Sequence, residues 1–187
     1  SATVRILDYQ PQHQPTFRAL NEEWITRYFR MEQPDYDMLD HPEQYILAPG
    51  GAILMAEYDG QLVGTCALIP EGHGVFELAK MAWVALGQAA LAKARQLGAR
   101  RVELLSNSRL LPALALYRKL GFQDLPVPSS PYQRTDVKMG LDLVTALGAP
   151  NHRRYTGRRQ ANCAHTAGHS SQSSQRNFKA RGARCSV

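Results

Sequence analysis

The pair Asp59-Gly60 constrains the fold of this chain more than any other short feature of its sequence. An Asp-Gly pair between two apolar segments is the strongest short-range signal for a β-hairpin with a two-residue turn. The flanking segments Ala52–Tyr58 and Leu62–Ile69 are both apolar, and a third apolar segment, Val75–Trp83, follows a turn at residues 70–74. Three consecutive antiparallel strands are therefore expected, and they exclude a doubly wound parallel sheet.

Helices and strands alternate on both sides of these three strands. Gly98 and Gly121 each follow an apolar periodic segment, and glycine in this place commonly closes a helix. The expected elements are a strand at Val4–Leu7, a helix at Pro15–Met31, a short helix capped by Asp40 and ending near Leu47, helices at Ala85–Leu97 and Pro112–Leu120, and strands at Arg101–Leu105 and Gln133–Leu143. Alternation in the last strand places Val137, Met139, Leu141 and Leu143 on one face. This order predicts a mixed α/β (α+β) fold.

The positive charge of the chain is concentrated at its end. The formal net charge is +6, yet residues 148–187 contain eight Lys and Arg and no acid, so all 16 acidic residues lie in residues 1–147. The segment 148–187 is also poor in apolar residues, and such a segment cannot offset the entropy of ordering its backbone. We expect one folded domain at residues 1–147 and a basic, disordered tail at 148–187.

Several classes of protein do not fit this composition. The sequence has neither an apolar run long enough for a membrane helix nor a basic-then-apolar leader, so a soluble cytoplasmic protein is expected. Cys66 lies in an apolar strand and is expected to be a reduced core residue. The tail residues Cys163, His165, His169 and Cys185 lack the spacing of a closed zinc site, so no metal is expected. The scattered cations of the tail are only a weak signal for nucleic acid.

Two segments contain the residues that could carry chemistry. Phe76–Ala82 is an apolar strand segment with one acid, Glu77, and Ala113–Phe122 is a helix that carries Tyr117 and is closed by Gly121. Together with Asn107, these segments resemble the acyl-CoA-dependent N-acetyltransferases of the GNAT superfamily, over roughly residues 3–145. The resemblance implies a mostly antiparallel, twisted central sheet flanked by helices, and acetyl-CoA as the acetyl donor.

Acetyl transfer from a thioester to an amine needs a base, a polarised carbonyl and an acid for the departing thiolate. The resemblance implies that Tyr117 is this acid; the alternative is that it only packs on an apolar helix face. Glu77 is the candidate base, and apolar neighbours would raise its pKa. A strand glutamate that faces solvent is an equally weighted alternative for Glu77.

The remaining predicted site residues would bind acetyl-CoA. The resemblance assigns the backbone N–H groups of Met81, Ala82 and Trp83 to the thioester carbonyl, and Asn107 and Ala113 to the cofactor. For Asn107, the family pattern would place the asparagine at position 110, which is a leucine here. An ordinary turn at the entry to a helix therefore remains open for Asn107.

One expected element is missing from the sequence. Family members bind the CoA pyrophosphate on backbone N–H groups in a glycine-containing loop between the fourth strand and the next helix, where the helix dipole favours anions. In this chain the strand ending in Lys80-Met81-Ala82-Trp83 leads directly into Val84-Ala85-Leu86. Strand-to-helix loops normally take about 2–6 residues even before any special function is added, so roughly ten residues are lacking here. Either a loop was omitted, in which case a break between Cα atoms is expected within Met81–Leu86, or the deletion is real. We expect the break.

These observations lead to two functional hypotheses. The first is an N-acetyltransferase in which the amine of a small molecule or peptide attacks acetyl-CoA directly. The second is a catalytically inactive domain of the same shape that serves as a binding or scaffold module. The acidic run 32–43 could attract a cationic amine or could be an ordinary solvated surface. Domains of this family are often dimers, so a homodimer is a further expectation.

Overall fold

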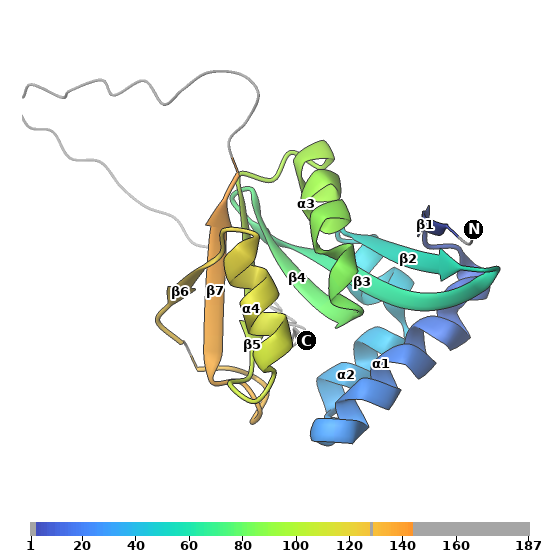
Figure 1. The fold of residues 1–187 in the computed structure, drawn as a ribbon, viewed down its shortest axis with the longest axis horizontal. Helices are drawn as coiled ribbons and strands as arrows, with labels where there is room; N and C mark the ends of the chain where they lie inside the picture. Colours follow the sequence, from blue (N-terminus) through green and yellow to red (C-terminus); the bar gives the residue numbers. More distant parts are fainter. Residues whose placement is uncertain (1–2, 128, 144–187) are drawn as a thin grey trace, which may run out of the picture. The chain divides into compact units, whose positions relative to one another are not determined.

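The computed structural model describes residues 3–127 and 129–143, and within them a seven-stranded sheet has the order β1-β2-β3-β4-β5-β7-β6 (Figure 1). Neighbouring strands are antiparallel except for β4 and β5, which are parallel. The elements are β1 Val4–Asp8, η1 Pro11–His13, α1 Gln14–Tyr28, α2 Gln33–Asp40, η2 Glu43–Leu47, β2 Ala52–Tyr58, β3 Gln61–Gly72, β4 Val75–Ala82, η3 Val84–Leu86, α3 Gly87–Gln96, β5 Arg101–Ser106, α4 Leu111–Lys119, β6 Gln123–Leu125 and β7 Val137–Asp142. The α+β class and the mostly antiparallel sheet are confirmed.

The predicted hairpin joins β2 to β3. Asp59 has a φ of 50° and Gly60 a φ of 76°, and a tight hairpin turn of this kind requires positive φ at both central residues. The last strand is also confirmed, although it begins at Val137 and not at Gln133. The four apolar residues predicted to share its face all belong to, or pack against, one core cluster.

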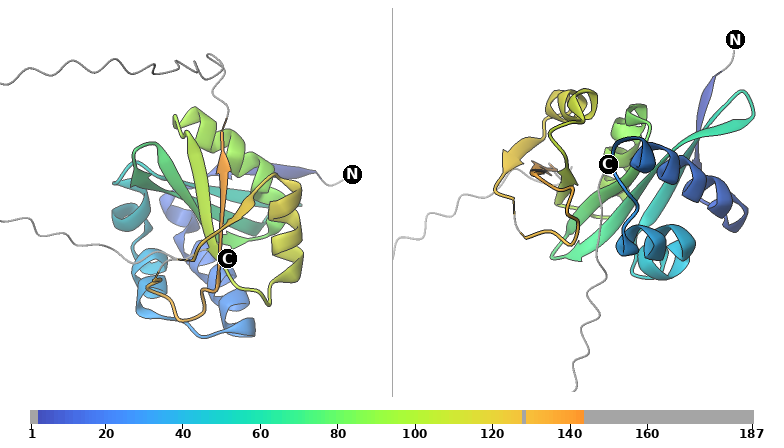
Figure 2. Two further views of the ribbon diagram at one scale, coloured as in Figure 1. Left: turned by 90° about the vertical axis from the view of Figure 1, so that its left-hand side faces the viewer. Right: turned by 90° about the horizontal axis from the view of Figure 1, so that it is seen from below.

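Helices cover both faces of the sheet, with α1 and α2 on one face and α3 and α4 on the other (Figure 2). The α3/α4 face buries a cluster that includes Leu68, Leu78, Leu104 and Tyr117. The α1/α2 face buries a second cluster, which includes Phe17 and Ile53. Because successive strand residues point to opposite faces, each central strand contributes to both clusters.

The sheet splits between β4 and β5. These strands pair only from Val75↔Arg101 to Glu77↔Glu103, although β4 continues to Ala82 and β5 to Ser106. Beyond the last pair, β4 stays with β3, and β5 stays with β7. Two α1-side residues, Trp24 and Phe29, pack against the core cluster of the opposite face.

One local expectation was wrong, and one helix was not expected. Asp40 does not cap a helix: it is the last residue of α2 and forms an ion pair with Arg18, and the next helical turn begins at Glu43. Helix α2 was not predicted, because its acids suggested a surface segment. Its start is closed by a reciprocal capping box between Glu32 and Asp35, in which the Asp35 carboxylate accepts from the Glu32 N–H at 3.0 Å.

The connection from β4 to α3 is short, and the break expected within Met81–Leu86 stays a prediction. Trp83 and the single turn η3 join the two elements, and the Leu86 N–H donates to the Trp83 carbonyl at 3.2 Å. Trp83 has a φ of 119°, which is a strained value for a residue with a side chain. The tail 148–187, with its cysteines and histidines, lies outside the described residues, as does the predicted domain boundary.

Candidate active site

A cavity of about 490 Å³ lies at the split of the sheet. Met81, Ala82 and Trp83 line it from the end of β4, and Ala113 lines it from α4. Trp24 and Arg27 of α1 are also in its wall. The structure thus brings together four of the residues predicted to bind the cofactor, because β4 and α4 border the same opening.

Tyr117 is fully buried behind this cavity. Its hydroxyl donates to the Sδ atom of Met81 at 3.6 Å, and Met81 itself lines the cavity. Burial raises the pKa of Tyr117, with a smaller contribution from Cys66, so the phenol keeps its proton at neutral pH. The Tyr117 ring also contacts Phe122 edge-on at 5.8 Å between centroids. The packing alternative for Tyr117 and the acid role are therefore compatible with each other.

Trp83 forms one wall of the cavity by lying close to β3. A Cβ atom at Gly64 would come within 2.8 Å of the Trp83 Cβ and 3.0 Å of the Ala82 carbonyl oxygen. Glycine at position 64 is thus required for this close approach. The Trp83 side chain remains partly exposed and borders the cavity.

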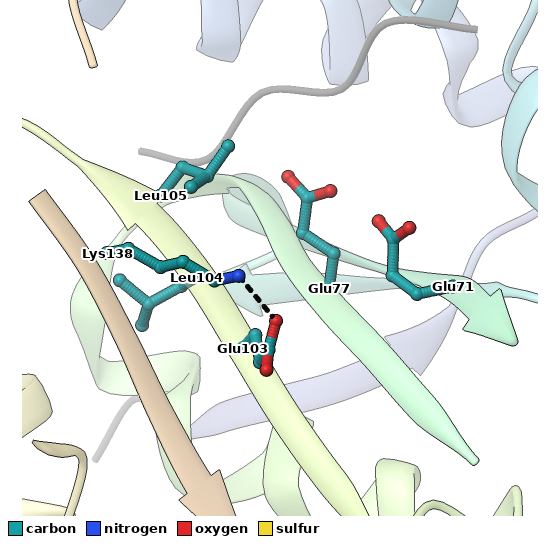
Figure 3. Close-up of a pocket in the computed structure, with 6 residues that line it drawn as sticks. All are labelled: Glu71, Glu77, Glu103, Leu104, Leu105 and Lys138. Carbon is teal, nitrogen blue, oxygen red and sulfur yellow. Dashed lines mark ion pairs between the residues drawn. The ribbon is translucent and has the colours of Figure 1, made fainter. Parts of the chain in front are cut away.

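Glu77 lies in a different and smaller pocket, of about 180 Å³, shown in Figure 3. The carboxyl groups of Glu77 and Glu71 point to the same side in this view, away from the ion pair of Glu103 and Lys138. Glu77 occupies the last paired position of β4 before the strands separate. Its neighbours Phe76 and Leu78 belong to the α3/α4 cluster, so Glu77 points to the α1/α2 face. Solvent exposure, the alternative reading, is wrong because Glu77 is 5% exposed.

The two predicted catalytic residues therefore approach the split from opposite faces of the sheet. The structure does not place Glu77 and Tyr117 in one pocket, and any joint action has to take place across the opening between β4 and β5. Part of the negative charge of the smaller pocket is neutralised by cations. Glu103 accepts from Arg101 at 2.9 Å and pairs with Lys138 at 3.0 Å. Burial would raise the pKa of Glu103, but these two partners outweigh it and lower the pKa.

The amide of Asn107 is engaged in local structure. Its Nδ2 donates to the Arg134 carbonyl at 2.6 Å, and its Oδ1 accepts from the Arg109 N–H at 2.8 Å. This geometry is that of a turn after β5, and Asn107 does not line the cavity at the split. Its role in cofactor binding stays a prediction.

A buried ion cluster, formed by Glu32, Asp35, Lys80, Tyr132 and Arg134, was missed by the sequence reasoning. Lys80 donates to Asp35 at 2.6 Å, and both side chains are fully buried. Arg134 donates to the two oxygens of the same carboxylate at 2.9 and 2.8 Å. Burial would raise the pKa of Asp35, but the Arg134 hydrogen bonds and the charge of Lys80 lower it to about 2.

The cluster corrects the interpretation of the acidic run 32–43. Asp35 is neither a solvated surface residue nor free to attract an amine, because it is held by two cations that lie 45 and 99 residues further along the chain. The signal that could have revealed the cluster is Lys80, a lone cation within an apolar strand. Such a residue needs a buried counter-charge.

The cavity fits one end of an acyl-CoA better than the other. Its walls at β4 and α4 are mostly apolar, as a pantetheine arm requires, and α1 contributes one positive charge, Arg27, and one negative charge, Glu23. At the start of α3, however, Leu86 is fully buried, and a Cβ at Gly87 would lie 2.6 Å from Leu120 Cδ1. The Leu120 side chain thus packs directly against the first residue of α3.

Neither a metal site nor a membrane helix is found in the part of the chain that the structure describes. No group of three or more His, Cys, Asp or Glu side chains there could hold a metal ion. Across the same residues, no helix has the length and apolar character needed to cross a bilayer.

Comparison with known proteins gives a consistent family match. Residues 18–122 match the sequence model described as "Acetyltransferase (GNAT) family". A GNAT-family acetyltransferase from Staphylococcus aureus Mu50 is similar in structure, with a TM-score of 0.67 at 18% identity over 76% of this chain and 100% of that chain. A Bacillus subtilis acetyltransferase solved in complex with CoA gives 0.54 at 19% identity, over 77% of this chain and 100% of that one. No curated protein matches the chain significantly. At these identities the structural similarity shows the fold alone.

Proposed function

This chain belongs to the acetyltransferase (GNAT) family, and from that premise we propose that it transfers the acetyl group of acetyl-CoA to the amine of a small molecule or peptide. The observation that carries the proposal is the position of Tyr117. Its protonated hydroxyl donates to a sulfur atom, that of Met81, at the wall of the cavity between β4 and α4. A phenol in this place is suited to give a proton to a thiolate in the same cavity.

The donor side of the proposed site consists of β4 and α4. Methionine is flexible and adapts its shape readily, so the Met81 side chain can move away and open the Tyr117 hydroxyl to the cavity. The backbone N–H groups of Met81, Ala82 and Trp83 would polarise the donor carbonyl, as the family resemblance implies. The similar B. subtilis protein was solved with CoA, which supports a CoA thioester as the donor here.

The acceptor side of the proposed site is the pocket of Glu77. Glu71 and Glu77 both line it, and carboxylates favour an amine that is protonated in solution. Glu77 would take the proton from the amine, through water, before or during attack. A bound thioester supplies an activated acetyl group: the amine nitrogen bonds to its carbonyl carbon, the C–S bond breaks, and the sulfur gains a proton from Tyr117.

A second candidate function is a domain that has this fold but does not catalyse transfer. The specific observation in its favour is the start of α3, where Leu120 occupies the space beside Gly87 and the connection from β4 is short. A connection this short leaves little room for a glycine-containing loop that would bind the CoA pyrophosphate. The domain would then serve as a binding or scaffold module.

Isothermal titration with acetyl-CoA, combined with an assay for thiol release in the presence of a panel of primary amines, tests the proposal. Binding together with amine-dependent release of CoA supports the acetyltransferase. No heat at millimolar acetyl-CoA and no release with any amine would favour the inactive module.

Light scattering on the same samples tests the expected homodimer. A cytoplasmic location and a separate basic tail at 148–187 also stay proposals, and fractionation and limited proteolysis test them.

A further inference from the structure

Lys80 has a backbone conformation that a lysine in a strand rarely adopts. Its φ is 51°, in the left-handed region. Thr65 and Ala67 are two positions apart on β3, but their partners on β4, Ala82 and Ala79, are three positions apart. The extra residue is a β-bulge, and it immediately precedes the three β4-end residues that line the cavity at the split. A strained residue of this kind persists only when its surroundings hold it in place.

The surroundings that hold Lys80 are charged and completely buried. Its ammonium group donates to Asp35 at 2.6 Å, and neither side chain is exposed. The Asp35 carboxylate is in turn fixed by the two-pronged contact from Arg134. The Tyr132 ring lies 5.5 Å from the Lys80 ammonium and 4.5 Å from the Arg134 guanidinium, so it covers both cations.

The far end of this arrangement is attached to the other side of the split. The Arg134 carbonyl accepts a hydrogen bond from Asn107, directly after β5, at 2.6 Å. The next turn residue, Ser108, donates to Asp136 through both its N–H and its hydroxyl. A continuous path of contacts, Lys80–Asp35–Arg134–Asn107, therefore leads from the bulge of β4 to the end of β5.

We propose that this path, which we call the bridge, sets the width of the split between β4 and β5, and that Lys80 is a positioning residue for the cavity. The bridge joins the two strands where they no longer share hydrogen bonds. By drawing the Lys80 side chain toward α2, it leaves Met81 on the opposite side, against Tyr117. The functional part of this inference rests on the proposed binding of a thioester donor in the cavity.

Charge explains why such a bridge gives a defined geometry. Buried ion pairs are weak contributors to stability compared with apolar residues of the same volume, but their hydrogen bonds are directional. The fork of Arg134 fixes the plane of the Asp35 carboxylate, and this carboxylate then has one oxygen in place for Lys80. An apolar cluster of equal size could slide, whereas this one holds the bulge in one position.

The test compares Lys80→Met, Arg134→Met, the double variant and a control, Ile53→Ala. Each methionine substitution removes one of the two cations that hold Asp35 and keeps an unbranched apolar side chain. Ile53 lies in the core of the α1/α2 face on β2, so its truncation lowers stability without cutting the bridge. Two readouts are measured on the full chain: hydrogen exchange of the amides of residues 80–83, and the Kd for acetyl-CoA.

Both single bridge variants are expected to speed the hydrogen exchange of residues 80–83 by about tenfold or more relative to the control. They are also expected to raise the Kd for acetyl-CoA by about tenfold, since coupled sites commonly interact at this scale. The double variant should have nearly the same exchange rate and Kd as the single variants, because the loss of either cation already interrupts the bridge. If Ile53→Ala, at matched stability, produces the same local exchange and the same Kd, the bridge is only part of the general core and the inference is overturned. If wild-type protein binds no acetyl-CoA while the exchange pattern is as expected, the proposed function fails and the bridge stands as a structural device.

Discussion

Replacement of Asp35 by asparagine is the sharpest test of the buried ion cluster. The Asp35→Asn variant keeps the size of the side chain and removes its charge, which leaves Lys80 and Arg134 close together without the carboxylate that both of them contact. Removing one partner from a buried ion pair typically lowers the free energy of unfolding by about 3–5 kcal/mol. The pKa of Asp35, lowered from 3.8 to about 2, corresponds to only about 2 kcal/mol. The larger value is expected, because the substitution also leaves two cations without a full counter-charge.

The assay is urea unfolding at pH 7, followed by circular dichroism, with Asp37→Asn as the matched control. Asp37 lies two residues further along α2, and its carboxylate accepts from Gln33 at 2.8 Å on an exposed part of the helix. Its replacement should change the free energy of unfolding by no more than about 0.5 kcal/mol. A loss below about 1 kcal/mol for Asp35→Asn would contradict the reading that this carboxylate holds the cluster together.

The same unfolding experiment is repeated at several pH values, and the direction of the pKa shift of Asp35 predicts how the free energy of unfolding changes with pH. A carboxyl group with a lowered pKa in the folded state contributes stability above its unfolded pKa and loses it as the pH falls. For Asp35, this contribution is complete above about pH 4 and disappears as the pH falls toward 2. The wild type should therefore lose more stability than Asp35→Asn between pH 4 and 2. Parallel pH profiles for the two proteins would refute the assignment.

Three further predictions concern single residues. Tyr117→Phe keeps the ring contact with Phe122 and should change stability by about 1 kcal/mol or less, while acetyl transfer falls about 100-fold or more; an unchanged rate would remove the acid role. Glu77→Gln should lower kcat and change its pH dependence, whereas Glu71→Gln, in the same pocket, should raise the KM for the amine and keep the wild-type pH dependence of kcat; wild-type turnover of Glu77→Gln at every pH would exclude it as the base. Burial raises the pKa of Cys66 to about 12, so peptide mapping should show its alkylation at pH 8 only after unfolding, and rapid labelling of the native protein would contradict its burial.

The candidate site was predictable where its residues are near one another in the sequence or follow a local pattern. Met81, Ala82 and Trp83 come from one strand end, and Ala113 and Tyr117 share a helix that is closed by Gly121. The structure places these residues around one cavity or directly behind it. Their helices and strands follow from apolar periodicity and glycine positions, which act over a few residues. The separation of Glu77 into a second pocket was not predictable, since it depends on which face of the split sheet it occupies.

Local sequence is enough to specify the hairpin at Asp59-Gly60, the alternation that makes β7 a strand with one buried face, and the family of the chain. These are local properties, because turn conformation and side-chain period depend on neighbouring residues. The partners of Asp35, Lys80 and Arg134, in contrast, depend on how the chain packs, because these residues come from an acidic helix, an apolar strand and a loop. A charge reveals its partner only when both are removed from water together, and that depends on the packing of segments that lie far apart in the chain.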